Sequence, residues 1–131
     1  MDVYFDTSAL AKLIVREFET RALEAWLDSS GAVPVSSVVA RVELMRFARR
    51  HGDEEIFRVA SLAEKLDFLT LSDDVVHLAG SLDPALLRSL DAIHLATALD
   101  LGSIISGVVT YDKRLAEACA LHGLEVIAPS E

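Results

Sequence analysis

Short apolar runs alternate along the chain with longer segments in which apolar residues recur every three or four positions. The short runs predict β-strands and the longer segments predict helices, because the two elements repeat their buried face with different periods. The expected strands are Val3–Phe5, Val33–Val35, Phe68–Leu71, Gly107–Thr110 and Val126–Ile127. The expected helices are Thr7–Val15, Phe18–Ser29, one that ends near Arg50, one that begins at Asp53, a short one through Leu78 and Ala79, Asp91–Leu101 and Lys113–His122.

Polar residues and glycines mark the ends of several of these helices. Ser36 or Ser37 is expected to cap the third helix, and Asp73 or Asp74 the fifth, because their side chains can accept from free N–H groups. Gly31 is expected to end the second helix. The helix boundaries are therefore predicted from chemistry as well as from periodicity.

Strands that alternate with helices indicate an α/β fold with a mainly parallel sheet covered on both faces. The runs are only two to four residues long, so the sheet is expected to be small and helix to predominate. In sheets of this kind a functional site lies beyond the carboxyl ends of the strands, where the strand order reverses.

Composition narrows the functional class. The 131 residues suit one domain, and a hydrophobic share of 52% excludes a disordered chain. The net charge of −9 argues against a purely electrostatic nucleic-acid binder, yet it suits a cation site or a basic protein partner. Cys119 is the one cysteine and is expected to be a buried apolar residue. With neither a signal peptide nor a membrane span in sight, we expect a soluble cytoplasmic protein.

Four acidic residues fall where this fold would gather them. Asp6 follows the first strand, and Asp112 follows the fourth after one intervening residue. Asp91 lies in the first turn of its helix, and Glu43 about two turns into the helix after the second strand. Each also has a plain structural explanation, as a helix cap, a first-turn acid or a solvated helix residue.

The local sequences around these acids are more specific than the acids alone. Asp6 opens Asp-Thr-Ser-Ala, Asp91 opens Asp-Ala-Ile-His-Leu-Ala-Thr-Ala, and Asp112 stands in Val-Thr-Tyr-Asp-Lys-Arg-Leu. Glu43 stands in Val-Ala-Arg-Val-Glu-Leu. Together and in this order, the segments resemble PIN-domain ribonucleases, and among them the VapC toxins of toxin–antitoxin pairs. The resemblance covers nearly the whole chain, although residues 53–90 carry little of it.

The resemblance implies a fold and a site. It implies one PIN domain over residues 1–131, a three-layer α/β/α arrangement with a small parallel sheet of about four to five short strands. It maps the family's acidic quartet onto Asp6, Glu43, Asp91 and Asp112, with Ser8 and Thr110 as supporting hydroxyls. His94 belongs to the same segment as Asp91, and we expect it to be structural, packing or bonding inside its own helix.

The implied chemistry needs a cation, because four converging carboxylates repel one another. All-oxygen ligation suits Mg²⁺ or Mn²⁺ rather than zinc. A divalent cation can activate water and stabilise charge on a phosphate, so the predicted reaction is hydrolysis of RNA to a 5′-phosphate and a 3′-hydroxyl. We expect Asp6 and Asp112 to be the most direct ligands, Asp91 next, and Glu43 to act through water.

Substrate and partner expectations follow from the same resemblance. Candidate phosphate contacts are Lys12, Arg46, Lys113 and Arg114, although a solvated surface explains them equally well. The resemblance implies a VapB-type antitoxin and a homodimer. Apolar candidates for the antitoxin surface are Phe18, Trp26, Leu44, Met45 and Phe47, most of which we expect to fill the core instead.

Three alternatives stay open at this point. A receiver-type signalling domain has the right size and acidity, but it requires a pair of acids after the first strand and a lysine after the last. A PIN fold that binds without turnover is disfavoured by the intact quartet. A PIN nuclease that acts on DNA or in RNA processing differs from a toxin only in its target, which the sequence does not specify.

Overall fold

The structure is a computed structural model that describes residues 1–131. Its centre is a parallel sheet of five short strands in the order β3-β2-β1-β4-β5. The strands are β1 (Asp2–Phe5), β2 (Val33–Ser37), β3 (Asp67–Leu69), β4 (Ile105–Val109) and β5 (Val126–Ile127). The first strand lies in the middle, with Tyr4 opposite Val35 on β2 and Val108 on β4. The strand order therefore reverses between β1 and β4.

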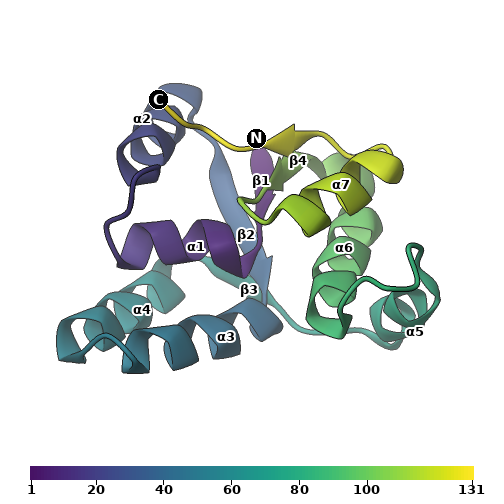
Figure 1. Cartoon of the computed structure of the whole chain (residues 1–131), viewed down its shortest axis with the longest axis horizontal. Helices are drawn as coiled ribbons and strands as arrows, with labels where there is room; N and C mark the ends of the chain where they lie inside the picture. Colours follow the sequence, from purple (N-terminus) through teal and green to yellow (C-terminus); the bar gives the residue numbers. More distant parts are fainter.

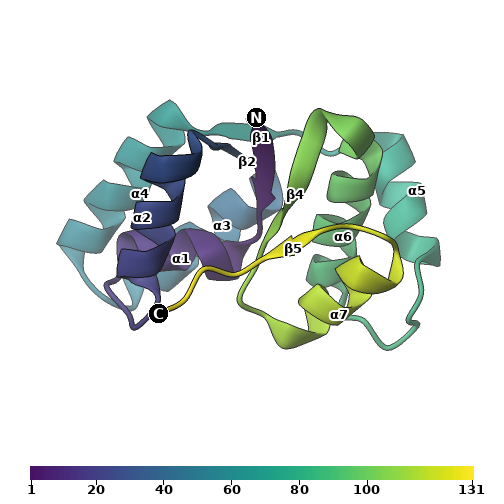
Figure 2. The same cartoon turned by 90° about the horizontal axis from the view of Figure 1, so that it is seen from above.

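Seven α-helices surround this sheet (Figure 1). Viewed from above, the first four helices lie on one side of the strands and the last three on the other (Figure 2). Their bounds are α1 (Thr7–Ile14), α2 (Thr20–Ser30), α3 (Val38–Arg49), α4 (Asp53–Lys65), α5 (Asp73–Ser81), α6 (Ser89–Leu101) and α7 (Lys113–Leu121), and a 3₁₀ turn (Gly102–Ile104) precedes β4. This arrangement confirms the predicted three-layer α/β/α fold.

Alternating side chains of β1 divide the core in two. Val3 and Phe5 pack with α1 and α3 on one face of the sheet, where Leu10 and Leu44 are fully buried. Tyr4 points to the other face. There it joins Leu95, Val108, Leu115 and Cys119, contributed by α6, β4 and α7. Each face of the central strand thus holds a different group of helices in place.

Helix ends agree with the sequence in some places and correct it in others. Ser37 caps α3, with its hydroxyl accepting from the N–H of Val39 at 3.1 Å. Gly31 ends α2 in the left-handed conformation, at φ 67°. The prediction that Asp73 or Asp74 caps α5 is wrong, because Ser72 has the extended backbone of a cap and accepts from Val75 N–H at 3.1 Å.

The remaining differences concern element limits. The third strand covers Asp67–Leu69 rather than Phe68–Leu71, since it is an edge strand that pairs only with β2, over three residues. The second strand is longer than predicted and continues to Ser37. Ser36 does not cap a helix; its hydroxyl donates to the carbonyl of Phe5 at 2.7 Å and joins the ends of β2 and β1.

Candidate active site

Asp6 occupies the turn between β1 and α1, at the centre of the sheet. It caps α1, and its Oδ1 accepts from the N–H of Ala9 at 3.0 Å. Its carboxylate also accepts from the hydroxyl of Ser8, at 2.7 Å to Oδ1, and from Thr110 Oγ1, at 2.7 Å to Oδ2. Asp6 is only 3% exposed. Burial raises the pKa of Asp6, while the hydrogen bonds from Thr110, Ser8 and Ala9 act in the opposite direction.

The two supporting hydroxyls link the ends of β1 and β4. Ser8 Oγ accepts from the N–H of Tyr111 at 2.9 Å, and Thr110 Oγ1 accepts from the N–H of Asp112 at 3.1 Å. Each hydroxyl thus receives a hydrogen bond from the segment after β4 and donates its own hydrogen to Asp6. The structure places Ser8 and Thr110 as the sequence predicted, around the first acid.

Asp112 and Asp91 lie at the starts of two neighbouring helices. Asp112 caps α7 and accepts from Leu115 N–H at 3.0 Å, while Asp91 lies in the first turn of α6. Both acids line one pocket of about 290 Å³, and the remaining lining residues are basic: Arg88, Lys113 and Arg114. The two acids therefore share one open pocket with three basic side chains.

A series of hydrogen bonds holds Glu43 in place and links α3 to α1, α6 and β1. Its Oε1 accepts from Thr7 Oγ1 at 2.6 Å and lies 3.0 Å from Nε2 of His94. The other ring nitrogen of His94 lies 2.7 Å from the hydroxyl of Tyr4, which is fully buried. Burial raises the pKa of Tyr4, so the phenol keeps its proton and donates to Nδ1. The hydrogen on Nε2 is then available to Glu43.

This series of hydrogen bonds corrects the expectation for His94 and determines the charge of Glu43. His94 is 2% exposed, but it bonds to Glu43 and Tyr4 on other elements and not inside its own helix. Partial burial raises the pKa of Glu43, yet the hydrogen bonds from His94 and Thr7 outweigh burial, so the pKa lies below its usual value. Glu43 is therefore ionised throughout the neutral range.

The four acids interact as one group. Burial raises the pKa of Asp91, and the nearby charge of Asp112 raises it further, as do Asp6 and Glu43. No lysine or arginine forms an ion pair with any of the four. The fold thus gathers four acidic side chains at the reversal of strand order, and no lysine or arginine lies within ion-pair distance of any of them.

The donor set fits a hard divalent cation. No three carboxylate, imidazole or thiol groups are arranged so that they alone would enclose an ion. A cation such as Mg²⁺ needs only one or two protein carboxylates because it keeps several of its waters. Asp91 and Asp112 are the acids that face the open pocket, whereas Asp6 is nearly covered. Roles as metal ligands stay predictions for all four.

Basic residues near the site differ in part from those expected. Lys113 and Arg114 line the acidic pocket, and so does Arg88, which was not among the expected phosphate contacts. Lys12 instead pairs with Glu19 at 3.0 Å and lies over the ring of Tyr111, 5.3 Å from its centroid. Arg46 lies on the exposed face of α3, in a separate pocket. Lys12 is therefore already engaged by acidic and aromatic neighbours.

The apolar candidates mostly fill the core, as expected. Leu44 is fully buried, and Trp26, Met45 and Phe47 pack against the same cluster. Phe18 is the exception, with an exposed fraction of 75%. Cys119 is buried as predicted, and burial raises the pKa of its thiol to about 12. No helix combines the length and the apolar character needed to cross a bilayer.

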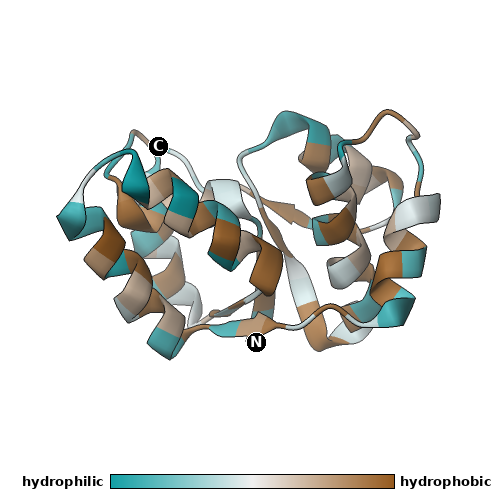
Figure 3. Ribbon diagram, turned by 90° about the horizontal axis from the view of Figure 1, so that it is seen from below, coloured by the Kyte–Doolittle hydropathy of each residue, from teal (hydrophilic) through white to brown (hydrophobic).

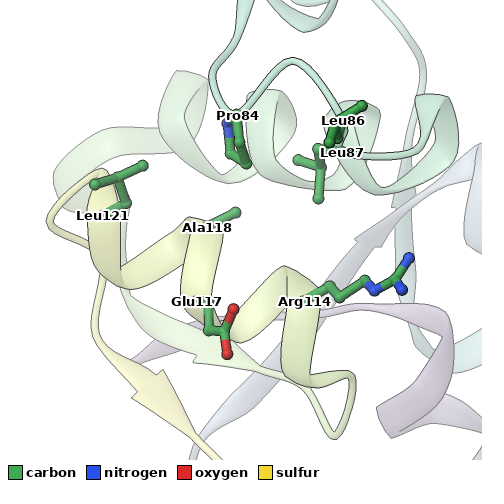
Figure 4. A pocket seen from close by; sticks show the side chains of 7 residues that line it. All are labelled: Pro84, Leu86, Leu87, Arg114, Glu117, Ala118 and Leu121. Carbon is green, nitrogen blue, oxygen red and sulfur yellow. The ribbon is translucent and has the colours of Figure 1, made fainter.

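An apolar pocket of about 510 Å³ adjoins the acidic one. It lies between the Pro84–Leu87 segment and α7, where Ala118 and Leu121 face the segment across the gap (Figure 4). Arg114 lines this pocket as well as the acidic one. Apolar surface therefore adjoins the pocket that Asp91 and Asp112 line, and Leu121 has an exposed fraction of 68%.

Comparison with known sequences agrees with this geometry. The PIN domain family model matches residues 3–121. "Ribonuclease VapC47" of Mycobacterium tuberculosis is 42% identical, with 97% of this chain and 96% of that protein covered. "Ribonuclease VapC46" of the same species is 43% identical, with 98% of each covered.

Comparison with solved structures supports the fold. Mycobacterium tuberculosis VapC20, described as a sarcin-ricin loop cleaving toxin, superposes with a TM-score of 0.76 at 18% identity, covering 97% of this chain and 99% of that one. A toxin–antitoxin complex from Klebsiella pneumoniae gives a TM-score of 0.74 at 22% identity, with 98% of both chains covered. Together with the sequence relatives and the matched family model, these findings show that the chain belongs to the PIN-domain family, in its VapC branch.

Proposed function

We propose that this chain is a Mg²⁺- or Mn²⁺-dependent endoribonuclease that serves as the toxin of a toxin–antitoxin pair. The observation that carries the proposal is the convergence of Asp6, Glu43, Asp91 and Asp112 at the reversal of strand order, with no lysine or arginine paired to them. The full-length relatives named ribonuclease VapC support the reaction class.

The residues take distinct roles in this proposal. Asp91 and Asp112 would hold the cation from the open pocket, Asp6 from its buried position after β1, and Glu43 through water. When bound, the cation activates water and offsets charge that builds on the phosphate. Arg88, Lys113 and Arg114 bind the flanking phosphates, because they line the same pocket as the acidic pair. Hydrolysis leaves a 5′-phosphate and a 3′-hydroxyl.

Ser8, Thr110 and His94 keep these acids in place without contacting substrate. The two hydroxyls donate to Asp6, and the imidazole donates to Glu43. A carboxylate whose orientation is already fixed loses less conformational entropy when it binds a cation or its waters. The hydrogen-bond network is thus part of the proposed active site.

The proposed partner is a VapB-type antitoxin that covers the site. Structural neighbours support this role, since they include complexes described as VapBC from Rickettsia felis and Mycobacterium tuberculosis. On this chain, Phe18, Leu86 and Leu121 are exposed apolar residues, and the last two lie at the pocket beside the acids. A homodimer stays a prediction, which sedimentation of the purified chain would check.

Cleavage of single-stranded RNA tests the proposal. Purified protein should cleave the RNA in Mg²⁺ or Mn²⁺ and not in EDTA, and Asp6→Asn and Asp112→Asn should abolish cleavage. Asp73→Asn and Asp74→Asn are matched controls, because they remove exposed first-turn acids of α5 and should leave the rate unchanged. Equal cleavage by wild type and the two site variants would refute the assignment of the site.

Induced expression tests the toxin role separately. Growth should stop when the chain is expressed and recover when the small basic protein expected from the adjacent upstream gene is co-expressed. Asp112→Asn, confirmed as soluble, should permit growth. Unaffected growth with active, soluble wild-type protein would contradict the toxin role and leave the nuclease assignment standing.

A further inference from the structure

The outer face of α3 carries a concentration of positive charge that the catalytic proposal does not use. The segment Val38–Arg50 holds four of the chain's 12 basic residues and one acid, Glu43, in a chain whose net charge is −9. Arg41, Arg46 and Arg49 line one pocket of about 370 Å³. None of these arginines forms an ion pair.

These three arginines, with Val42 and Met45 between them, form what we term the α3 arginine face. All three arginines are exposed, and Val42 has an exposed fraction of 63%. The three arginines are not needed to hold the fold together, because α3 packs against α1 and α4 through Leu44 and Ala48 on its opposite side.

The α3 arginine face lies on the same helix as Glu43, one of the four acids. The helix follows β2 directly and carries Glu43 within its second turn. Seen from below, α3 runs from the centre of the molecule toward its periphery (Figure 3). Arg88, Lys113 and Arg114 lie on the opposite side of the acids, at the starts of α6 and α7. Two basic clusters therefore flank the acidic group.

We propose that the α3 arginine face binds the phosphate backbone of single-stranded RNA that extends from the scissile bond. The inference rests on the proposed ribonuclease function and adds a substrate-binding track to it. Arginine is the residue best suited to bidentate phosphate contacts, and a line of cations along one helix matches a linear polyanion. Val42 and Met45 offer apolar area to a ribose or a base between those contacts.

Salt-dependent RNA binding tests the track. The affinity for a short fluorescein-labelled oligouridylate is measured by anisotropy in EDTA, so that no cleavage occurs, over a series of salt concentrations. Arg46→Gln/Arg49→Gln removes two phosphate contacts, so the slope of log affinity against log salt should fall by about 1.4 and the affinity by about 25-fold at 0.1 M salt. Adding Arg41→Gln should lower the slope by about a further 0.7.

A matched control distinguishes the loss of local phosphate contacts from the effect of a changed net charge. Arg16→Gln/Arg21→Gln removes the same two charges from exposed positions before and on α2, outside both basic clusters. The inference predicts a wild-type slope for this control and the same losses for oligouridylate and oligoadenylate, because backbone contacts carry no sequence information.

Three outcomes would refute the proposal that the α3 arginine face binds the RNA backbone. Equal slopes for the two double variants would show that only net charge acts. A loss for one oligonucleotide alone would indicate base recognition in place of backbone contacts. If the α3 variants bind RNA as wild type does but change dimerisation or binding of an antitoxin, the face is a protein interface. The nuclease proposal fails separately, when wild type does not cleave RNA in Mg²⁺.

Discussion

His94 provides the sharpest test of how the site is held together. Its Nε2 lies 3.0 Å from Glu43 and its Nδ1 lies 2.7 Å from the Tyr4 hydroxyl. Two amide substitutions separate the contact with Glu43 from the contact with Tyr4. In His94→Gln the amide nitrogen can reach the place of Nε2 and still donate to Glu43, whereas in His94→Asn the shorter amide reaches only the place of Nδ1. Both variants keep a polar, uncharged side chain at a position that is 2% exposed.

The structure sets the expected size of the difference. A hydrogen bond to a charged group contributes about 1.5–3 kcal/mol, and the lower end applies because the side chain of Glu43 is 30% exposed. A loss of about 1.4 kcal/mol corresponds to a factor of ten in an equilibrium constant. We therefore expect His94→Asn to raise the half-saturating Mg²⁺ concentration for RNA cleavage about tenfold, within the usual range for residues that orient ligands. His94→Gln should raise it less than about threefold.

The assay is the initial rate of cleavage of a fluorogenic RNA as a function of Mg²⁺, with thermal unfolding in EDTA measured alongside. The unfolding temperatures identify any general loss of packing, which a smaller side chain in the core would cause in either variant. If both variants shift the Mg²⁺ dependence equally while remaining folded, His94 fills space and does not position Glu43. The same conclusion follows if neither variant shifts it.

Three further predictions concern charge, capping and packing. Because the pKa of Asp91 is raised in the folded state, this carboxyl lowers stability as the pH rises above the usual aspartate pKa of about 4. Asp91→Asn should therefore raise the unfolding temperature in EDTA at pH 7 and reduce the stabilisation by Mg²⁺ in scanning fluorimetry; no change in either quantity would contradict the prediction. Ser72→Ala should cost about 1 kcal/mol in urea denaturation and Asp73→Ala less than half as much, since Ser72 holds the cap; equal costs would contradict the cap assignment. Gly107→Ala should cost about 1–3 kcal/mol, because its Cβ would lie 2.8 Å from Ile127 Cδ1 and 3.1 Å from the carbonyl of Glu125. Gly80→Ala, which meets nothing within 4 Å, should be neutral or stabilising in the same measurement.

Hydrophobic periodicity predicted the fold because burial of an apolar face determines the residue pattern of most helices and strands. The helices α1, α3 and α7 show buried stripes at helical spacing, and β1 and β4 are apolar runs short enough to favour strands over helices. The prediction was less accurate where an element is short and has few neighbours to pack against. The edge strand β3 has three paired residues and one neighbour, so its limits depend on the register with β2 rather than on its own sequence.

The acids of the site were predictable because they follow strands or begin helices, and topology alone brings such positions together. Their partners were not. Thr7 and His94 bond to Glu43, and Tyr4 bonds to His94 from a position 90 residues away in sequence. Tyr4 and His94 read as ordinary core residues, since the sequence shows their burial but not what their polar atoms contact. Arg88 was missed for a related reason, because only the packing of α6 beside α7 brings it to the acidic pocket.

Helix capping and the proposed metal-binding role are compatible uses of the same carboxylate. Asp6 and Asp112 both cap helices, which is the plain structural explanation that their sequence positions suggested. Each uses one oxygen for the cap: Oδ1 of Asp6 accepts from Ala9 N–H, and Oδ1 of Asp112 accepts from Leu115 N–H. The cap fixes the side chain at both positions, and at Asp6 the hydrogen bond from Ala9 N–H favours the ionised form. At Asp6 this contribution opposes burial, which raises its pKa. A carboxylate that is buried, oriented and still drawn toward its charged form is suited to a divalent cation, and helix capping supplies two of those three properties.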